Sequence, residues 1–327
     1  MTFQKNKKIA GMILLILIIL LFIYYSYENI SAFNTLFLTL TNPLNIFPIT
    51  VFSIIFIIIL LLNGVLLDVL MIPFNVKLKL KEALGLSIIT NFYNYITPFK
   101  GGMAVRAMYL KEKHNFAYVH FLSTLSAIYI IIFFIGSFAG LISMYFLWQS
   151  QKVFNPIIFL TFLLIFLFLL AIMIFSPKIP KSKNKWINRV INVINGWHLI
   201  KNNKRIIFVT ALISLIQLIL GAINFIILYS IFDIQITFFQ SLFITSIGSL
   251  SLLLAITPGN LGIGDAINVF SASIIGVGIN EAVVATILGR AINLLIIFIL
   301  GPIFSYILLN HKPGLINKVK KRNRGLK

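Results

Sequence analysis

Runs of about 20 apolar residues recur along the whole chain and constrain its fold more than any other feature. A helix needs about 20 mostly apolar residues to cross a bilayer, since each residue rises about 1.5 Å. With 60% hydrophobic and only 10% charged residues, the chain is neither an ordinary soluble globule nor disordered. The sequence therefore predicts an all-α integral membrane protein. The predicted spans are residues 9–25, 46–67, 117–147, 156–176, 206–231 and 282–309.

Two further apolar stretches are too interrupted to be simple spans. Residues 83–99 are short and carry several polar side chains before Pro98. Residues 237–278 are broken in the middle by the segment 257–265, which reads Thr-Pro-Gly-Asn-Leu-Gly-Ile-Gly-Asp. Proline stops a helix and glycine permits a sharp reversal. We therefore expect each stretch to enter the membrane and return to the same side.

The distribution of positive charge favours this topology. Cytoplasmic loops of membrane proteins carry an excess of Lys and Arg. With the amino terminus inside and both interrupted stretches re-entrant, 25 of the 27 Lys and Arg residues are cytoplasmic, and only Lys152 and Arg290 are not. The sequence thus predicts a cell-membrane protein of six transmembrane helices plus two re-entrant hairpins. Both termini are expected in the cytoplasm, with a basic tail over residues 312–327. The first apolar run lacks a small-residue cleavage site, so we expect a retained span.

The order of these elements repeats with inverted topology. Each half contains two spans, a re-entrant hairpin and a further span, and the halves cover about 1–150 and 151–311 of a single polytopic domain. The breaks are alike, since Ile-Thr-Pro occurs at 96–98 and again at 256–258. Many transporters are inverted repeats whose broken helices meet near the middle of the membrane and mark the substrate site. We therefore expect a substrate cavity between the two repeats.

Arg290 is the strongest candidate functional residue. It lies nine residues, or about 13 Å of helix, beyond Glu281 and within an apolar run. A charge inside the membrane costs at least ~3 kcal/mol unless it is paired or hydrated, which makes a functional role the default. Two interpretations stay open: Arg290 binds an anionic headgroup, or it is a structural partner of Asp265. Asp265 itself either caps the helix that follows it or faces the same cavity.

The other candidate residues surround the two breaks. A helix that starts after each break presents free N–H groups and a partial positive charge, which suits a phosphate. Arg106 is either a phosphate ligand or one more cytoplasmic charge, and Lys100 is a weaker candidate of the same kind. We expect Asn91 and Asn94 to bond across the first hairpin or to line the cavity, because unpaired amides are costly there. The predicted substrate-binding residues are Arg106, Asp265, Arg290, Lys100, Asn91, Asn94 and Asn260, and the predicted breaks are Pro98, Gly101, Gly102, Pro258, Gly259, Gly262 and Gly264.

Composition limits the chemistry further. The chain has no cysteine and only four scattered histidines, so we expect neither a disulfide, nor a metal site, nor another cofactor. No two of its seven acidic residues lie within four positions of each other, which argues against a general-base or metal-dependent enzyme. The net charge of +20 would suggest nucleic acid in a soluble protein. Here it is better explained by basic loops that face an anionic leaflet, so the predicted partners are anionic membrane lipids and not nucleic acid.

The segment 91–106 resembles the first Pro/Gly motif of the lysylphosphatidylglycerol synthase transmembrane family, which are flippase-like membrane proteins. That motif has a proline, a glycine four residues on, commonly an acidic residue next, and an arginine near the following turn. Pro98, Gly102 and Arg106 fit this pattern, whereas Met103 stands where the acid is common. Any role of that acid is therefore missing from this chain.

The segment 257–265 is similar to the second motif of the same family, with Pro258, Gly262, Gly264 and the acid Asp265. The resemblance extends over nearly the whole chain. Members of the family that transfer lysine carry a separate soluble catalytic domain, and this sequence ends after a short basic tail. We therefore expect it to lack lysyl-transferring activity.

Two functions from different classes fit these features. The first is a lipid flippase or transporter that moves a polar, anionic or lipid-linked headgroup through the cavity between the repeats. The second is a membrane subunit that anchors or gates a separate lipid-modifying or glycosyl-transferring enzyme through its cytoplasmic basic loops. The inverted repeat, the two breaks and the intramembrane charges favour the first.

Overall fold

The computed structural model describes residues 39, 42–176, 178–180 and 185–309, and within these ranges it contains helices and no strand. This confirms the predicted all-α class. The predicted first span and the basic tail lie outside the described residues. Residues Pro48–Lys327 form one compact unit, which contains all but the first two residues of helix α3 and every helix from α4 onwards.

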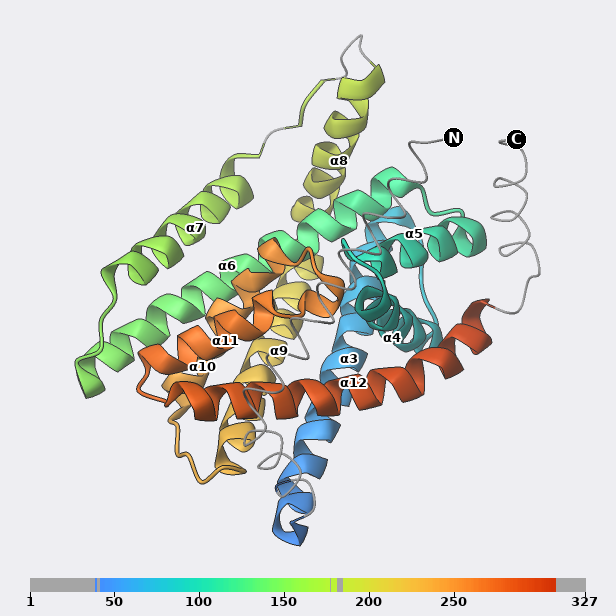
Figure 1. Cartoon of the computed structure of the whole chain (residues 1–327). Coiled ribbons are helices and arrows are strands. Elements are labelled where there is room, and N and C mark those ends of the chain that lie inside the picture. Colours follow the sequence, from blue (N-terminus) through green and yellow to red (C-terminus); the bar gives the residue numbers. More distant parts are fainter. Residues whose placement is uncertain (1–38, 40–41, 177, 181–184, 310–327) are drawn as a thin grey trace, which may run out of the picture. The chain divides into compact units, whose positions relative to one another are not determined.

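Five described helices are long and apolar enough to cross a membrane, and they match five of the predicted spans. The chain is therefore a multi-pass membrane protein. Large apolar side chains remain exposed on these helices, as lipid-facing surfaces require. The five are α3 (Ile46–Met71), α6 (Tyr118–Gln151), α7 (Pro156–Phe175), α9 (Lys204–Ser230) and α12 (Ile279–Leu309), shown in Figure 1.

The first interrupted stretch forms a hairpin of two helices, α4 (Leu80–Ile96) and α5 (Gly101–His114). The arms pack so closely at the turn that a Cβ on Gly102 would collide with the Thr90 carbonyl, which explains the glycine there. The predicted boundaries 83–99 covered only the entering arm. The returning arm lies beyond these boundaries, because α5 carries Arg106 and several lysines and does not continue the apolar run.

A buried carboxylate, that of Glu82, connects the two arms at the open end of this hairpin. Glu82, near the start of α4, accepts a hydrogen bond from the Tyr109 hydroxyl at 2.7 Å. It also contacts His114 Nε2 at 2.7 Å and Lys113 Nζ at 3.0 Å, all near the end of α5. Burial alone would raise the pKa of Glu82, but the hydrogen bonds from His114, Tyr109 and Lys113 outweigh it and lower the pKa to about 2. The start of α4 and the end of α5 therefore lie next to each other.

The second interrupted stretch forms a matching hairpin of α10 (Phe238–Leu250) and α11 (Ile263–Ile274). Two short 3₁₀ turns, η3 (Ser251–Leu254) and η4 (Pro258–Asn260), lie between the arms. At the open end, the Gln240 side chain donates to the Ile275 carbonyl at 3.3 Å. This hairpin therefore also returns to its starting point.

The two hairpins meet tip to tip. The backbone N–H of Phe99 donates to the Ile256 carbonyl at 3.1 Å, and Lys100 Nζ donates to the Leu252 carbonyl at 2.8 Å. Gly259 has a φ of 58° and lies so close to the Tyr95 ring that a side chain there would clash, so only glycine suits the position. The tips thus form a single contact region built from both interrupted stretches.

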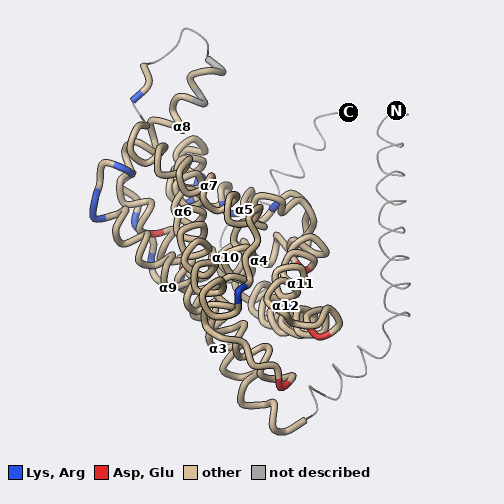
Figure 2. The backbone as a smooth tube through the Cα atoms, turned by 90° about the vertical axis from the view of Figure 1, so that its left-hand side faces the viewer, with Lys and Arg blue, Asp and Glu red and all other residues tan. Residues whose placement is uncertain are grey.

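Each hairpin is held by a long helix from the other half of the chain. Helix α6 packs along α10 of the second hairpin, and α12 packs along α4 of the first. Figure 1 shows α10 and α11 in orange beside the green α6. A shorter helix, α8 (Lys185–Asn202), packs on α6 and buries Trp197 and Ile200. In Figure 2 the longest blue stretch of Lys and Arg positions lies at the left-hand edge, level with the labels α6 and α7.

Candidate functional site

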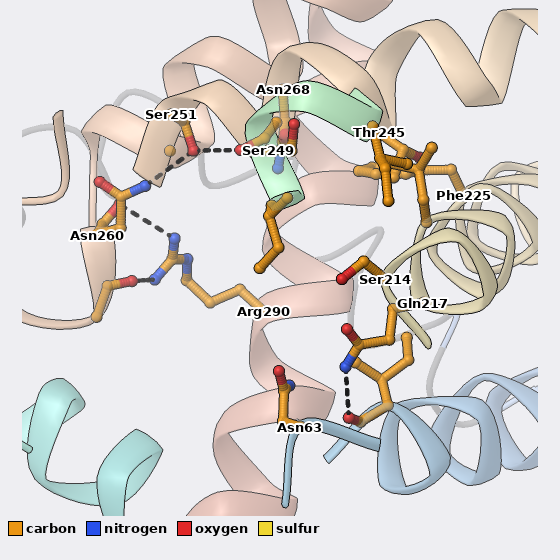
Figure 3. Close-up of a pocket in the computed structure, with 17 residues that line it drawn as sticks. Asn63, Ser214, Gln217, Phe225, Thr245, Ser249, Ser251, Asn260, Asn268 and Arg290 are labelled. Carbon is orange, nitrogen blue, oxygen red and sulfur yellow. Dashed lines mark hydrogen bonds between the residues drawn. The ribbon is translucent and has the colours of Figure 1, made fainter. Parts of the chain in front are cut away.

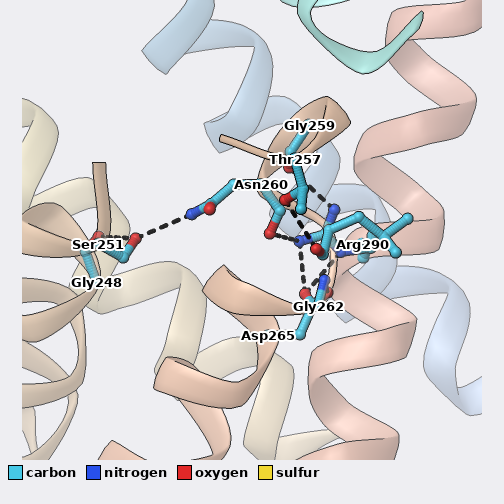
Figure 4. Close-up of polar contacts among 9 residues, drawn as sticks. Gly248, Ser251, Thr257, Gly259, Asn260, Gly262, Asp265 and Arg290 are labelled. Carbon is cyan, nitrogen blue, oxygen red and sulfur yellow. Dashed lines mark hydrogen bonds and ion pairs between the residues drawn. The ribbon is translucent and has the colours of Figure 1, made fainter. Parts of the chain in front are cut away.

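Arg290 ties helix α12 to the tip of the second hairpin (Figure 4). Its Nε donates to Asp265 Oδ1 at 2.6 Å, and its Nη1 and Nη2 donate to the carbonyls of Gly259 and Asn260 at 3.1 and 3.4 Å. The α12 backbone places Arg290 more than two turns after the helix start at Ile279. The guanidinium is therefore engaged by one carboxylate and two backbone oxygens.

Asp265 does not precede the helix, as the sequence suggested, but is the third residue of α11, from which it reaches back to the N-cap Gly262 and also lines the smaller cavity. Its Oδ2 accepts the backbone N–H of Gly262 at 2.9 Å, which caps the start of α11. Its Oδ1 pairs with Arg290 at the same time, and the two side chains are 26% and 18% exposed. One carboxylate thus fixes the turn after the break and neutralises the arginine.

Two adjoining cavities lie on either side of this ion pair. The larger measures about 400 Å³ and lies among α3, α6, α9, α10, α11 and α12, with the tip of the second hairpin in its wall. The smaller measures about 280 Å³ and is lined by Tyr95, Asp265 and residues of α3, α9, α11 and α12. The two share Ile59, Phe225, Asn268 and Arg290 as lining residues. Arg290 therefore lies at the junction of the two spaces.

The walls of both cavities are rich in amides and hydroxyls. In Figure 3, Asn63, Ser214 and Asn268 surround the space beside Arg290 from three different helices. Buried side-chain oxygens of five lining residues have no hydrogen-bond partner among the described residues: Ser214, Asn224, Asn260, Thr286 and Asn293. Buried polar atoms are normally satisfied, so unpaired ones concentrated at one place indicate bound water or a ligand.

Sequence reasoning missed most of these polar residues, although a signal was present. Thr286, Arg290 and Asn293 are spaced i, i+4 and i+7, which places them on one face of α12. Gln217 and Asn224 have the same i, i+7 relation on α9. Polar residues at helical spacing within an apolar span mark a cavity-facing stripe, and this pattern was available before the structure.

Of the predicted binding residues, the structure gathers Arg290, Asp265 and Asn260 at the cavities. It does not bring the others there. The Asn94 amide oxygen accepts the Gly102 N–H at 2.9 Å, so it bonds across the first hairpin, whereas Asn91 donates within α4 to Ser87. The remaining two, Lys100 and Arg106, lie on the first hairpin and do not line either cavity.

Arg106 is buried without a carboxylate partner among the described residues. It is 7% exposed, its Nη2 lies 3.0 Å from the Met103 sulfur, and its guanidinium carbon lies 5.4 Å from the centre of the Phe121 ring. Its Nε has no hydrogen-bond partner in the described part of the chain. Met103 stands where the resemblance leads one to expect an acid. Its sulfur thus contacts the Arg106 guanidinium, which a carboxylate at this position would neutralise.

The predicted breaks coincide with the turns between hairpin arms. Pro98 lies between α4 and α5, and Gly101 and Gly102 are the first two residues of α5. Pro258 and Gly259 form η4, Gly262 is the N-cap of α11, and Gly264 packs against Asn260. Within the described ranges, no three His, Asp or Glu side chains gather as metal ligands would.

One comparison with known proteins identifies a relationship. Residues 9–301 match the family model described as lysylphosphatidylglycerol synthase TM region. The match covers both hairpins, both cavities and all five described membrane-length helices apart from the last turns of α12. No curated protein and no solved structure is significantly similar to the chain.

Proposed function

Because the chain belongs to the lysylphosphatidylglycerol synthase transmembrane-region family, we propose that it is a lipid transporter of the flippase type. A polar lipid headgroup crosses the membrane through the cavities beside Arg290, while its acyl chains stay in the bilayer. The observation that carries this proposal is a pair of adjoining cavities with a charged pair in their wall, built inside a bundle of membrane-length helices. Such intramembrane charges commonly mark substrate pathways.

In this proposal, both hairpins are re-entrant and their tips meet inside the membrane. The contacts of Glu82 and Gln240 at the two open ends support this, because each hairpin returns to the side from which it enters. Phe99, Leu253 and Ile256 at the tips are more than half exposed, which suits contact with acyl chains. Together with the predicted span 9–25, this gives six crossings in an inverted repeat. The reciprocal packing of α6 on α10 and of α12 on α4 supports that symmetry.

Cysteine labelling tests this topology, and the native chain contains no cysteine to interfere. Cysteines at positions 105, 185 and 320 should react with a membrane-impermeant reagent from the cytoplasmic side, and one at position 152 from outside. We expect this labelling pattern because, in the proposed topology, each hairpin returns to the side of the membrane from which it enters. If position 105 reacts only from outside, the first hairpin crosses the membrane and the inverted repeat is wrong.

The mechanism requires the ion pair to open. In the present state, all three nitrogen atoms of the Arg290 guanidinium are engaged, so a headgroup phosphate reaches it only by displacing Asp265. The free N–H groups at the start of α11 then add to the attraction for the phosphate. Arg106 is a buried cation that lacks a carboxylate among the described residues, but it lines neither cavity, so the proposed path does not include it. The lysines in the last turns of α5 and α8 draw anionic lipids to the cytoplasmic side.

Reconstitution of the purified chain tests the proposal. Proteoliposomes that contain fluorescent phospholipids should lose fluorescence from both leaflets when an external quencher is added, whereas empty liposomes should lose about half. Lipid movement at the rate of empty liposomes, for every headgroup tried, would overturn the transport function. The same result is what the second candidate predicts, because a subunit that anchors or gates another enzyme is inert alone.

A further inference from the structure

The polar atoms around Arg290 have a composition that the proposed function does not explain. A phosphate accepts hydrogen bonds and needs donors, yet the polar side chains of the lining are mostly carboxamides and hydroxyls, which can both donate and accept. The unpaired oxygens belong to two hydroxyl residues, Ser214 and Thr286, and to three asparagines. Buried polar groups of this kind cost free energy when they stay unpaired.

The charges of the cavities also cancel. Arg290 and Asp265 are the only ionisable Lys, Arg, Asp or Glu residues among those that line the two spaces, and they neutralise each other. A ligand recognised mainly by charge would be matched by an excess of one sign. The hydrogen-bonding groups therefore outnumber the charged groups as recognition elements.

We propose that the two cavities select lipids whose headgroup carries several hydroxyl groups, such as a sugar or another polyol on a phosphodiester. This inference rests on the proposed transport function and specifies its substrate class. Hydroxyl groups are the one common headgroup chemistry that donates and accepts at the same atom, so they satisfy amides and hydroxyls alike. An ammonium only donates, a phosphate only accepts, and an acyl chain would leave the five unpaired oxygens of the wall without partners.

The space available fits such a headgroup. The larger cavity alone has about 400 Å³, more than ten times the roughly 30 Å³ that one water molecule occupies in the liquid. The unpaired oxygens come from three separate elements, since Ser214 and Asn224 lie on α9, Thr286 and Asn293 on α12, and Asn260 on η4. A ring with hydroxyls around its edge can meet groups that approach from several directions, as these do.

Binding of matched lipids tests the inference. The probes are dioctanoyl phosphatidylmethanol, phosphatidylglycerol and phosphatidylinositol, which share one phosphodiester charge and differ in hydroxyl number. Affinity for the purified chain in detergent is measured by the shift in thermal unfolding temperature against lipid concentration. We expect affinity to rise in that order, with at least about a tenfold difference between the methanol and inositol lipids, since each hydrogen bond contributes roughly 0.5–1.5 kcal/mol.

Paired variants assign the preference to the cavities. Thr286→Val and Ser214→Ala remove unpaired hydroxyls in the cavity walls and should each reduce the inositol-to-methanol ratio several-fold. Thr210→Val and Ser87→Ala are the controls, because those hydroxyls are equally buried and unpaired but do not line either cavity. The controls should leave the ratio unchanged.

Three results would overturn the inference. Equal affinity for the three lipids would mean that water, and not the headgroup, bonds to the unpaired oxygens of the cavity wall. An equal fall of the inositol-to-methanol ratio in the control variants would mean that the preference does not arise in the cavities. Equal affinity for free myo-inositol 1-phosphate would overturn the assignment to lipid. Transport assays of the same three lipids separate this failure from that of the proposed function: equal transport of all three refutes only the selectivity, whereas no transport of any refutes the transporter.

Discussion

Replacing Arg290 tests whether the central ion pair serves transport or only holds the fold. Arg290→Ala removes three contacts at once, to Asp265 and to the carbonyls of Gly259 and Asn260. Breaking a fully buried pair costs about 3–5 kcal/mol, and an exposed pair contributes at most about 1 kcal/mol. The two side chains here retain 18% and 26% exposure, so we expect the free energy of unfolding to fall by about 2–3 kcal/mol.

The double variant Asp265→Asn/Arg290→Ala separates the two roles. Asparagine keeps an oxygen to cap α11 and removes the unpaired charge, so stability should return to within about 1 kcal/mol of the native chain. Stability is followed by thermal unfolding in detergent, and transport by the quenching assay in proteoliposomes. We expect the double variant to fold normally and still not to transport. The exposed cation Arg205 supplies the control, since Arg205→Ala should change neither measurement.

The result that would refute this reasoning is full transport by the double variant. Arg290 would then be a structural partner of Asp265 and nothing more, and the headgroup would cross by another route. Loss of transport together with restored stability is the outcome that supports an arginine that contacts the phosphate.

Two further predictions concern the first hairpin. Met103→Glu should raise the unfolding temperature in detergent, because the new carboxylate reaches the buried guanidinium of Arg106. The control Ala104→Glu, on the exposed side of the same turn, should not raise it. Equal shifts in the two variants would show that Arg106 is already satisfied. Glu82→Gln should lower the free energy of unfolding at neutral pH relative to the native chain. This difference should shrink as the pH falls from about 4.5 towards about 2, because the folded-state pKa of Glu82 lies below its usual value and the native chain loses the stabilisation on protonation. The exposed Glu112→Gln is the control, and a deficit that is constant with pH would contradict a role for the charge of Glu82.

The fold was largely predictable because apolar length is a strong signal. Five spans agree with the predicted ranges, since a run such as 156–176 has few alternatives to crossing a bilayer. The two breaks were also predictable, because Pro and Gly interrupt helices for local steric reasons. The extent of α5 was not, because its lysines and Arg106 give this segment an ordinary polarity.

Only the charged part of the candidate site was predicted, although its polar residues also carried a signal at helical spacing. Arg290 and Asp265 stood out because a charge in an apolar run has a high cost, and they do pair. Asn224 and Thr286 did not stand out, since a single amide or hydroxyl in a span costs little and its orientation depends on which helices pack around it. Arg106 was expected beside the same anion, but the first hairpin turns its side chain towards α6 and Phe121 instead. That direction is set by tertiary packing, which no local pattern records.

Helix α12 contacts both hairpins, and this gives the two halves a mechanical connection. It packs along α4 of the first hairpin, and its Arg290 donates hydrogen bonds to the tip of the second. The two tips are also hydrogen-bonded to each other. If the chain transports lipid, as we propose, α12 and the bonded tips transmit a movement of one hairpin to the other, and a ligand bound at one tip influences the affinity at the other. Thermodynamic linkage makes that influence equal in both directions. In the proposed transporter, one long helix would thus couple the two hairpins.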